Sequence, residues 1–186
     1  MNATTYNKLF DDIIEGKINT APYDNPEYTN YVKLNKSRSK RWDKRGDLTE
    51  ELKKVVGNIQ EEQTWIMISE PWCGDAAHSA PMIQKISAIN DKITFEIQLR
   101  DSNSEIEKYL TNGGKAVPKL IVRDKAGKDI FTWGPRPKGA QKLVLAQKNR
   151  EDLTTVEKYT NILQWYIKDD GVSIQEEIIE EIKKAV

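Results

Sequence analysis

Apolar residues recur at three- and four-residue steps near the start of the chain, and this spacing predicts a helix with one buried face. Within residues 4–18 this spacing places Tyr6, Leu9, Phe10, Ile13 and Ile14 on one face. Two prolines interrupt the pattern within residues 21–26, and the polar segment that follows also resembles a helix. Residues 47–59 predict a third helix, with Asp47 or Thr49 as its N-cap.

The middle of the chain changes to the spacing of strands. Short apolar or alternating runs predict strands at 64–69, 93–99, 118–124 and 129–133. An amphipathic helix is predicted at 74–90 and a short helix at 104–111, whereas the last two strands are joined by a turn. The order β-α-β-α-β-β predicts the α/β class, with a mixed sheet that is parallel at its start and antiparallel at its end.

The remainder of the chain returns to helical spacing. Residues 138–170 predict one long helix or two consecutive ones, and residues 173–186 predict a last amphipathic helix. We expect these helices to pack on the sheet, so that residues 1–186 form one domain. It would consist of an N-terminal helical extension (1–60), an α/β core (61–150) and C-terminal helices (151–186).

Charge and composition exclude several classes of function. The 29 basic and 29 acidic side chains cancel, so no net field favours nucleic acid or an anionic membrane. The basic run within residues 36–45 fits a solvated helix face. No apolar run is long enough to span a bilayer, and the first residues lack a signal-peptide pattern, so we expect a cytoplasmic protein. A single cysteine and a single histidine predict no intrachain disulfide and no metal site.

The segment "SEPWCGDAAHSAP" (69–81) contains both of these residues. Cys73 falls where the first predicted strand meets the following helix. Backbone N–H groups and the helix dipole stabilise a thiolate at such a position, which gives the sulfur a physical reason to be reactive. Gly74 fits the tight turn, and Trp72 would shield one side of the sulfur.

This segment resembles the active-site motif of thioredoxins, in which Trp-Cys-Gly-x-Cys begins a helix. Pro81 matches the proline that kinks this helix, Val117-Pro118 resembles the cis-proline that faces the reactive sulfur, and Gly134 matches a glycine of the substrate groove. The resemblance implies a thioredoxin-like fold, β-α-β-α-β-β-α, with added helices at both ends. Over roughly residues 1–170 the chain is similar to a bacterial group of the family with N-terminal helices and a WCGD site.

Two departures from the thioredoxin pattern restrict the chemistry. Ala76 stands where the second, resolving cysteine belongs, and Met67 occupies the position of a buried acid in the preceding strand. Thioredoxins release their substrate when the resolving thiol attacks the mixed disulfide, so general dithiol reduction is not expected here. The first hypothesis is monothiol exchange at Cys73, or its oxidation to sulfenic acid, with a disulfide-bearing protein or a low-molecular-weight thiol as partner.

The second hypothesis is a redox-inactive thioredoxin-fold module that binds an extended peptide beside the cis-proline. Monothiol glutaredoxins hold an iron–sulfur cluster through a single cysteine, but the "GDAAH" sequence after Cys73 differs from theirs, so no cofactor is expected.

Four further side chains near the motif have two interpretations each. Asp75 is expected to cap the helix, although near the sulfur it would raise the thiol pKa. His78 lies about 140° around the helix from Cys73 and is expected to pack against a helix or to face solvent. Arg136, between Pro135 and Pro137, either reaches over the site to stabilise a thiolate or an anion, or is a surface residue. Lys119 is expected at the groove edge or in solvent.

Overall fold

The computed structural model of the chain describes residues 1–185. Its helices and strands follow one another as α1 (Ala3–Ile14), α2 (Pro26–Arg41), α3 (Glu50–Gly57), β1 (Gln63–Ser69), α4 (Gly74–Ser87), β2 (Ile93–Leu99), the 3-10 helix η1 (Ile106–Lys108), β3 (Lys119–Asp124), β4 (Asp129–Trp133), α5 (Lys138–Gln147), α6 (Thr155–Asp169) and α7 (Val172–Ala185). No helix among these residues is both long enough and apolar enough to cross a membrane.

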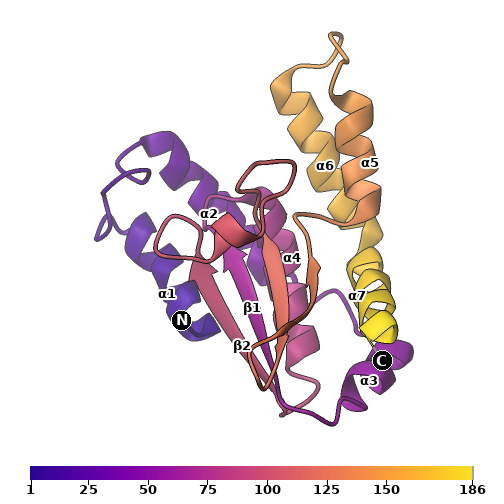
Figure 1. The fold of residues 1–186 in the computed structure, drawn as a ribbon. Helices are drawn as coiled ribbons and strands as arrows, with labels where there is room; N and C mark the ends of the chain where they lie inside the picture. Colours follow the sequence, from indigo (N-terminus) through magenta and orange to yellow (C-terminus); the bar gives the residue numbers. More distant parts are fainter. Residues whose placement is uncertain (186) are drawn as a thin grey trace.

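The four strands form one mixed sheet in the order β2-β1-β3-β4 (Figure 1). β1 runs parallel to β2 and antiparallel to β3, and β3 runs antiparallel to β4. In this register Trp65 pairs with Phe95 on one side and with Val122 on the other. The α/β class and the thioredoxin-like arrangement expected from the sequence are therefore confirmed.

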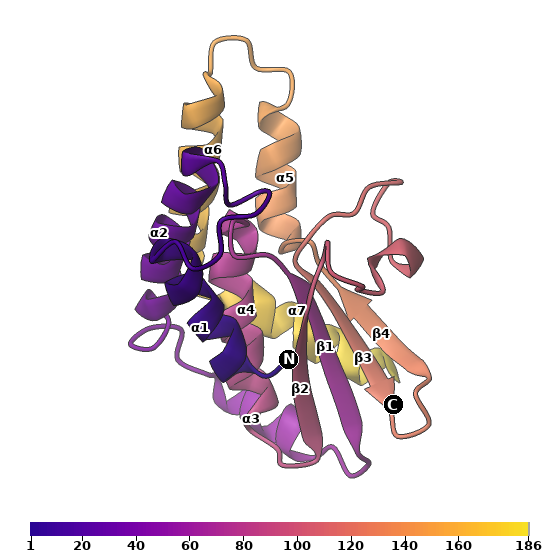
Figure 2. The same ribbon diagram turned by 90° about the vertical axis from the view of Figure 1, so that its left-hand side faces the viewer.

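Most helices pack on one face of the sheet. The core on this face joins buried residues of the sheet (Trp65, Met67, Leu120, Val122) to buried residues of α1, α4 and α7 (Phe10, Ile13, Ile83, Ile86, Ile174, Ile178). Figure 2 shows α1, α2 and α4 together beside the sheet, away from the loop that contains η1. On the opposite face Ile66, Ile68 and Ile121 pack against Ile106 and Val117 of that loop.

The helix predicted at 104–111 is wrong, because only η1 forms there. Eight residues make a marginal helix unless an apolar face is packed. Ser104 also satisfies nearby backbone groups, since its hydroxyl donates to Arg100 O at 2.8 Å and accepts from the N–H of Ile106 at 3.4 Å. Such local side-chain bonds compete with helix formation.

Residues 138–170 form two helices, one of the two alternatives. α5 and α6 make a hairpin that projects beyond the end of the sheet (Figure 1). Thr154 and Glu157 form a capping box at the start of α6.

In α4, Pro81 has no N–H to offer the carbonyl of Ala77. That carbonyl instead accepts a hydrogen bond of 3.2 Å from Ser39 Oγ of α2. The N-terminal α2 is thereby attached to the motif helix.

Candidate functional site

Cys73 occupies the N-cap position of α4, directly after β1 and a short turn. Its Sγ donates a hydrogen bond of 3.3 Å to the carbonyl of Val117, and the Val117–Pro118 peptide is cis. Gly134 adopts a φ of +111°, and a Cβ there would lie 2.3 Å from the carbonyl oxygen of Pro118. Only glycine allows the end of β4 to approach Pro118 this closely. The structure thus brings together Cys73, Val117, Pro118 and Gly134, which lie far apart in the sequence.

The environment of the thiol opposes ionisation. The Cys73 side chain is only 8% exposed. Burial first, and the negative charge of Asp75 second, raise the pKa of the Cys73 thiol to about 12. The backbone N–H groups of Ala76 and Asp75 and the charge of Arg136 lower this pKa, but by less. The helix start therefore favours the thiolate as expected, but desolvation outweighs it in this conformation.

Asp75 does not cap α4. Cys73 holds the N-cap position, and the Asp75 carboxylate points away from the backbone to accept from Tyr166 Oη at 2.8 Å and from Arg136 Nη2 at 2.5 Å and Nε at 3.1 Å. Arg136 also donates to Gln141 Oε1 at 3.2 Å. Arg136 therefore reaches the site, as one interpretation of the sequence held, and its anionic partner there is Asp75.

Helices α2 and α6 close over the turn that contains Cys73. Asn35 donates to the carbonyl of Pro71 at 2.9 Å, and Arg38 Nη1 donates to Asn35 Oδ1 at 2.7 Å and to Tyr159 Oη at 3.1 Å. A Cβ on Gly74 would lie 2.2 Å from Tyr159 Oη. A side chain at position 74 would thus displace Tyr159. We call Asn35, Arg38 and Tyr159 the α2–α6 cover.

Trp72 is held between two side chains from different elements. The ring of Tyr28 meets it edge-on at 6.1 Å, and the guanidinium of Arg100 lies 4.7 Å from its ring centre. The second distance falls within the range of a cation–π contact. Trp72 is half-buried, packs against the apolar cluster that contains Cys73, and positions Arg100.

A buried acid is present, but three residues before Cys73. Glu70 is 5% exposed, and its carboxylate accepts from Tyr23 Oη at 3.1 Å and from the N–H of Asp101 at 3.2 Å. Burial raises the pKa of Glu70. Met67 lies fully buried in the core on the helical face of the sheet. In the sequence, Glu70 could have been identified as the single acidic residue between the apolar strand and Trp72-Cys73.

Ala76 and His78 are both buried, with different neighbours. Ala76 packs with Ile66, Ile68 and Val117 in the apolar cluster that also includes Cys73. His78 packs against helices, as one of its two interpretations held: its ring stacks on Tyr166 at 4.7 Å, and its Nδ1 accepts from Trp42 Nε1 at 3.3 Å. Burial lowers the pKa of His78 to about 3, so the ring is neutral.

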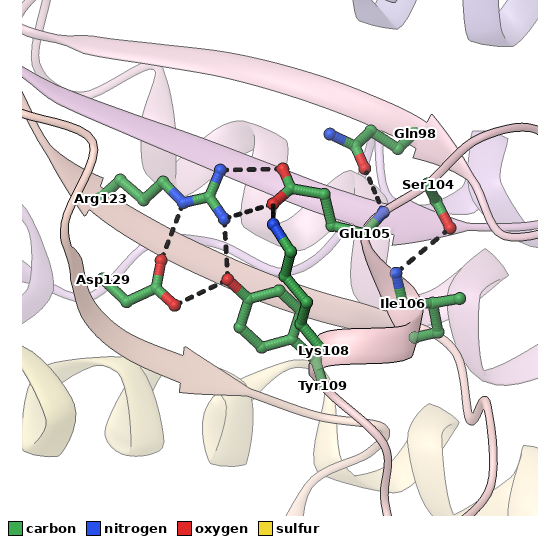
Figure 3. Close-up of polar contacts among 8 residues, drawn as sticks. All are labelled: Gln98, Ser104, Glu105, Ile106, Lys108, Tyr109, Arg123 and Asp129. Carbon is green, nitrogen blue, oxygen red and sulfur yellow. Dashed lines mark hydrogen bonds and ion pairs between the residues drawn. The ribbon is translucent and has the colours of Figure 1, made fainter.

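The loop between β2 and β3 carries Val117 and is fastened by a charged network (Figure 3). Arg123 of β3 donates to both carboxylate oxygens of Glu105 at 2.8 Å, to Asp129 at 2.8 Å and to Tyr109 Oη at 2.7 Å.

Lys119, next to Pro118, is half-buried, and burial lowers the pKa of its ammonium group. Within residues 1–185 no group of three or more histidine, cysteine or acidic side chains is arranged to hold a metal ion.

Comparison with known proteins agrees with this architecture. A protein of unknown function from Pseudomonas aeruginosa superposes with a TM-score of 0.52 at 14% identity, over 86% of this chain and 86% of that one. An HIV epitope-scaffold superposes with a TM-score of 0.57 at 15% identity, over 97% of this chain and 99% of that one. Both likenesses concern the fold alone, and no curated protein matches the chain. The thioredoxin family matches residues 22–160, which is more than half of the sequence, and the chain therefore belongs to that family.

Proposed function

We propose that this protein carries out monothiol thiol–disulfide exchange through Cys73, as a single-cysteine, WCGD-type member of its family. The observation that carries the proposal is the position of the sulfur: Cys73 Sγ begins α4 and lies 3.3 Å from the carbonyl of Val117, beside the cis bond to Pro118. In this family a disulfide substrate meets the reactive sulfur beside the cis-proline. Ala76 replaces the resolving thiol, so a second molecule must complete the cycle.

The reaction has two balanced steps. Cys73 loses its proton, and its sulfur forms a bond to one sulfur of the disulfide while the disulfide bond breaks. The other sulfur leaves with the electron pair and takes up a proton as a thiol. A second thiol then attacks the mixed disulfide and restores Cys73, and that thiol is oxidised to a disulfide. We propose a reducing compartment such as the cytoplasm, where low-molecular-weight thiols are abundant.

Burial of the Cys73 thiol makes thiol–disulfide exchange slow in the described conformation. Because burial raises the pKa of the Cys73 thiol, a far smaller fraction of it is ionised at pH 7 than of an ordinary exposed thiol. A more basic thiolate is a better nucleophile, which recovers only part of this loss, so the net rate still falls. Exchange at useful rates then requires that the α2–α6 cover opens.

A redox-inactive binding module is the second candidate. The burial of Cys73, with its raised pKa, favours this candidate, because a thiol that stays protonated and enclosed has no redox role. In that case the sulfur serves as a small buried apolar group.

The two candidates predict different behaviour toward glutathione disulfide. Native protein would be incubated with it between pH 6 and pH 10, and the mass added to Cys73 would be followed over time. Cys73→Ser provides the blank, and urea-unfolded protein gives the rate of the same thiol without its surroundings. Formation of a mixed disulfide that glutathione then removes supports monothiol exchange. Native protein that never forms it, while unfolded protein does, overturns the proposal in favour of the binding module.

A further inference from the structure

We infer that the disulfide partner of Cys73 is a small molecule that carries carboxylate groups. This inference rests on the proposed function and concerns the substrate of the same site. Three arginines from separate parts of the chain lie around the turn that contains Cys73: Arg38 from α2, Arg100 from the loop after β2, and Arg136 from the loop after β4. Arg100 and Arg136 contact sequence neighbours of Cys73 directly, and Arg38 is linked to one through Tyr159.

Arg100 is attached to Trp72, the residue before the cysteine. Its guanidinium lies 4.7 Å from the ring centre of Trp72, while its Nε and Nη2 donate to the two oxygens of Asp101 at 2.9 and 2.8 Å. The contacts of the described residues leave Nη1 of Arg100 without a partner. Stacking fixes the plane of the guanidinium and leaves that edge for another acceptor.

Arg38 is linked to Gly74, the residue after the cysteine, through Tyr159. Its Nη1 lies 3.1 Å from Tyr159 Oη, and that oxygen lies 2.2 Å from the place of a Cβ on Gly74. Among residues 1–185, Asn35 and Tyr159 are its hydrogen-bond partners, and both use Nη1. Nε and Nη2 therefore remain as donors, in the paired arrangement that binds a carboxylate with two parallel bonds.

Arg136 is attached to Asp75, two residues after the cysteine. It donates to Asp75 and to Gln141 and retains further N–H groups, because a guanidinium carries five. The charge of a Cys73 thiolate interacts favourably with both Arg136 and Arg100, which places both guanidinium groups within electrostatic reach of the sulfur.

The acidic groups nearby offset this charge only in part. Asp75 and Asp101 are paired with two of the arginines, and Glu70 accepts hydrogen bonds from Tyr23 and from the backbone of Asp101. Lys119 adds a further ammonium group beside Pro118. The site therefore has an excess of positive charge, although the 29 basic and 29 acidic side chains of the whole chain cancel.

The enclosure of the sulfur selects for size. Cys73 is 8% exposed, packs with Ile106 and Val117 of the β2–β3 loop, and lies in the turn that the α2–α6 cover contacts, so a bulky protein disulfide has poorer access to the sulfur than a small one. A small disulfide needs a smaller opening. In the exchange step its carboxylates stay bound to the arginines, while one of its sulfurs bonds to Cys73 and the other leaves as a thiol.

The test compares three small disulfides of different charge at Cys73: glutathione disulfide (anionic), hydroxyethyl disulfide (neutral) and cystamine (cationic). Each rate on native protein is divided by the rate on urea-unfolded protein, which removes the intrinsic reactivity of the reagent. We expect native protein to favour glutathione disulfide over cystamine by about tenfold at about 0.02 M salt, and by much less at about 0.5 M. Arg38→Gln and Arg100→Gln should each reduce this preference roughly threefold.

Arg150→Gln is the matched control, since Arg150 also pairs with an aspartate but lies exposed in the α5–α6 loop. Equal relative rates for the three reagents, or a preference unchanged by salt and by both arginine variants, would refute the inference and leave monothiol exchange standing. Native protein that reacts with none of the three would refute the proposed function itself. A faster relative reaction with cystamine would also overturn the inference, because it would show that the acidic groups dominate.

Discussion

Replacing Gly74 by alanine provides a direct test of the α2–α6 cover. Gly74 has an ordinary helical backbone, so alanine introduces no backbone strain. Its Cβ would lie 2.2 Å from Tyr159 Oη and 3.1 Å from Tyr159 Cζ, whereas a carbon and an oxygen normally stay about 3.3 Å apart. Tyr159 must therefore move by about 1 Å, which also breaks its 3.1 Å bond with Arg38.

The size of the effect follows from the cost of overpacking. An extra methyl group in a closely packed place costs about 1–3 kcal/mol. The closed conformation bears this cost, whereas an open one does not. Since about 1.4 kcal/mol corresponds to a tenfold change in an equilibrium, the open population rises about 5-fold to about 150-fold. The rate at which Cys73 is alkylated should rise by the same factor, because the open form is the reactive one.

The assay is the second-order rate of iodoacetamide addition to Cys73 at pH 7.5, followed by mass spectrometry under native conditions. Gly57→Ala is the matched control, because a Cβ on this other helical glycine meets nothing within 4 Å. Tyr159→Phe removes the hydroxyl, so alanine at position 74 should have a smaller effect in that background. A Gly74→Ala protein that keeps its thermal midpoint and the parent alkylation rate would refute the cover.

Three other changes test the electrostatics. Asp75→Asn removes the charge that helps to raise the pKa of Cys73, so alkylation should become about tenfold faster and its pH profile should move to lower pH; an unchanged profile would contradict this. His78→Phe should flatten the loss of stability between pH 6.5 and pH 3, because unfolded chains protonate His78 below about pH 6.5 while the folded chain, with a pKa of about 3, does not. That loss amounts to at most about 1.4 kcal/mol per pH unit in urea unfolding, and equal slopes in both proteins would count against it. Glu105→Gln should cost about 1 kcal/mol through the weakened contact with Arg123 and speed amide exchange in residues 100–118, and unaltered exchange would show that the network does not fasten the loop.

The strands were predictable because their signal is local. Alternation and β-branched residues identified 93–99 and 129–133 at their observed bounds and the other two strands within one residue. The segment at 104–111 also has local features, but those of a helix. Its side chains are used in long-range contacts instead, since Glu105 and Tyr109 bind Arg123 of β3. No pattern within the segment reveals that partner.

The same difference between local signals and long-range contacts explains which residues of the site were predicted and which were missed. Cys73, Pro118 and Gly134 were identified through the resemblance to thioredoxins, and at Pro118 and Gly134 the backbone itself, a cis peptide and a positive φ, restricts the residue type. Tyr159 and Arg38 were missed because they act through side chains on helices that are distant in sequence and have no preferred residue type. Asp75 was assigned to the cap because aspartate is common there, but a guanidinium and a phenol outweigh a single backbone N–H as partners.

The absence of a resolving thiol and the burial of Cys73 have a joint consequence for the proposed cycle. In a dithiol protein the second cysteine attacks the mixed disulfide from inside, so release does not depend on access from solvent. With the buried Ala76 methyl in that place, the incoming thiol must reach the same enclosed sulfur as the disulfide did. Both half-reactions then depend on one opening of the α2–α6 cover. Gly74→Ala should accelerate formation and resolution of the mixed disulfide by a common factor, whereas a variant that acts through the thiol pKa should change the first step more than the second.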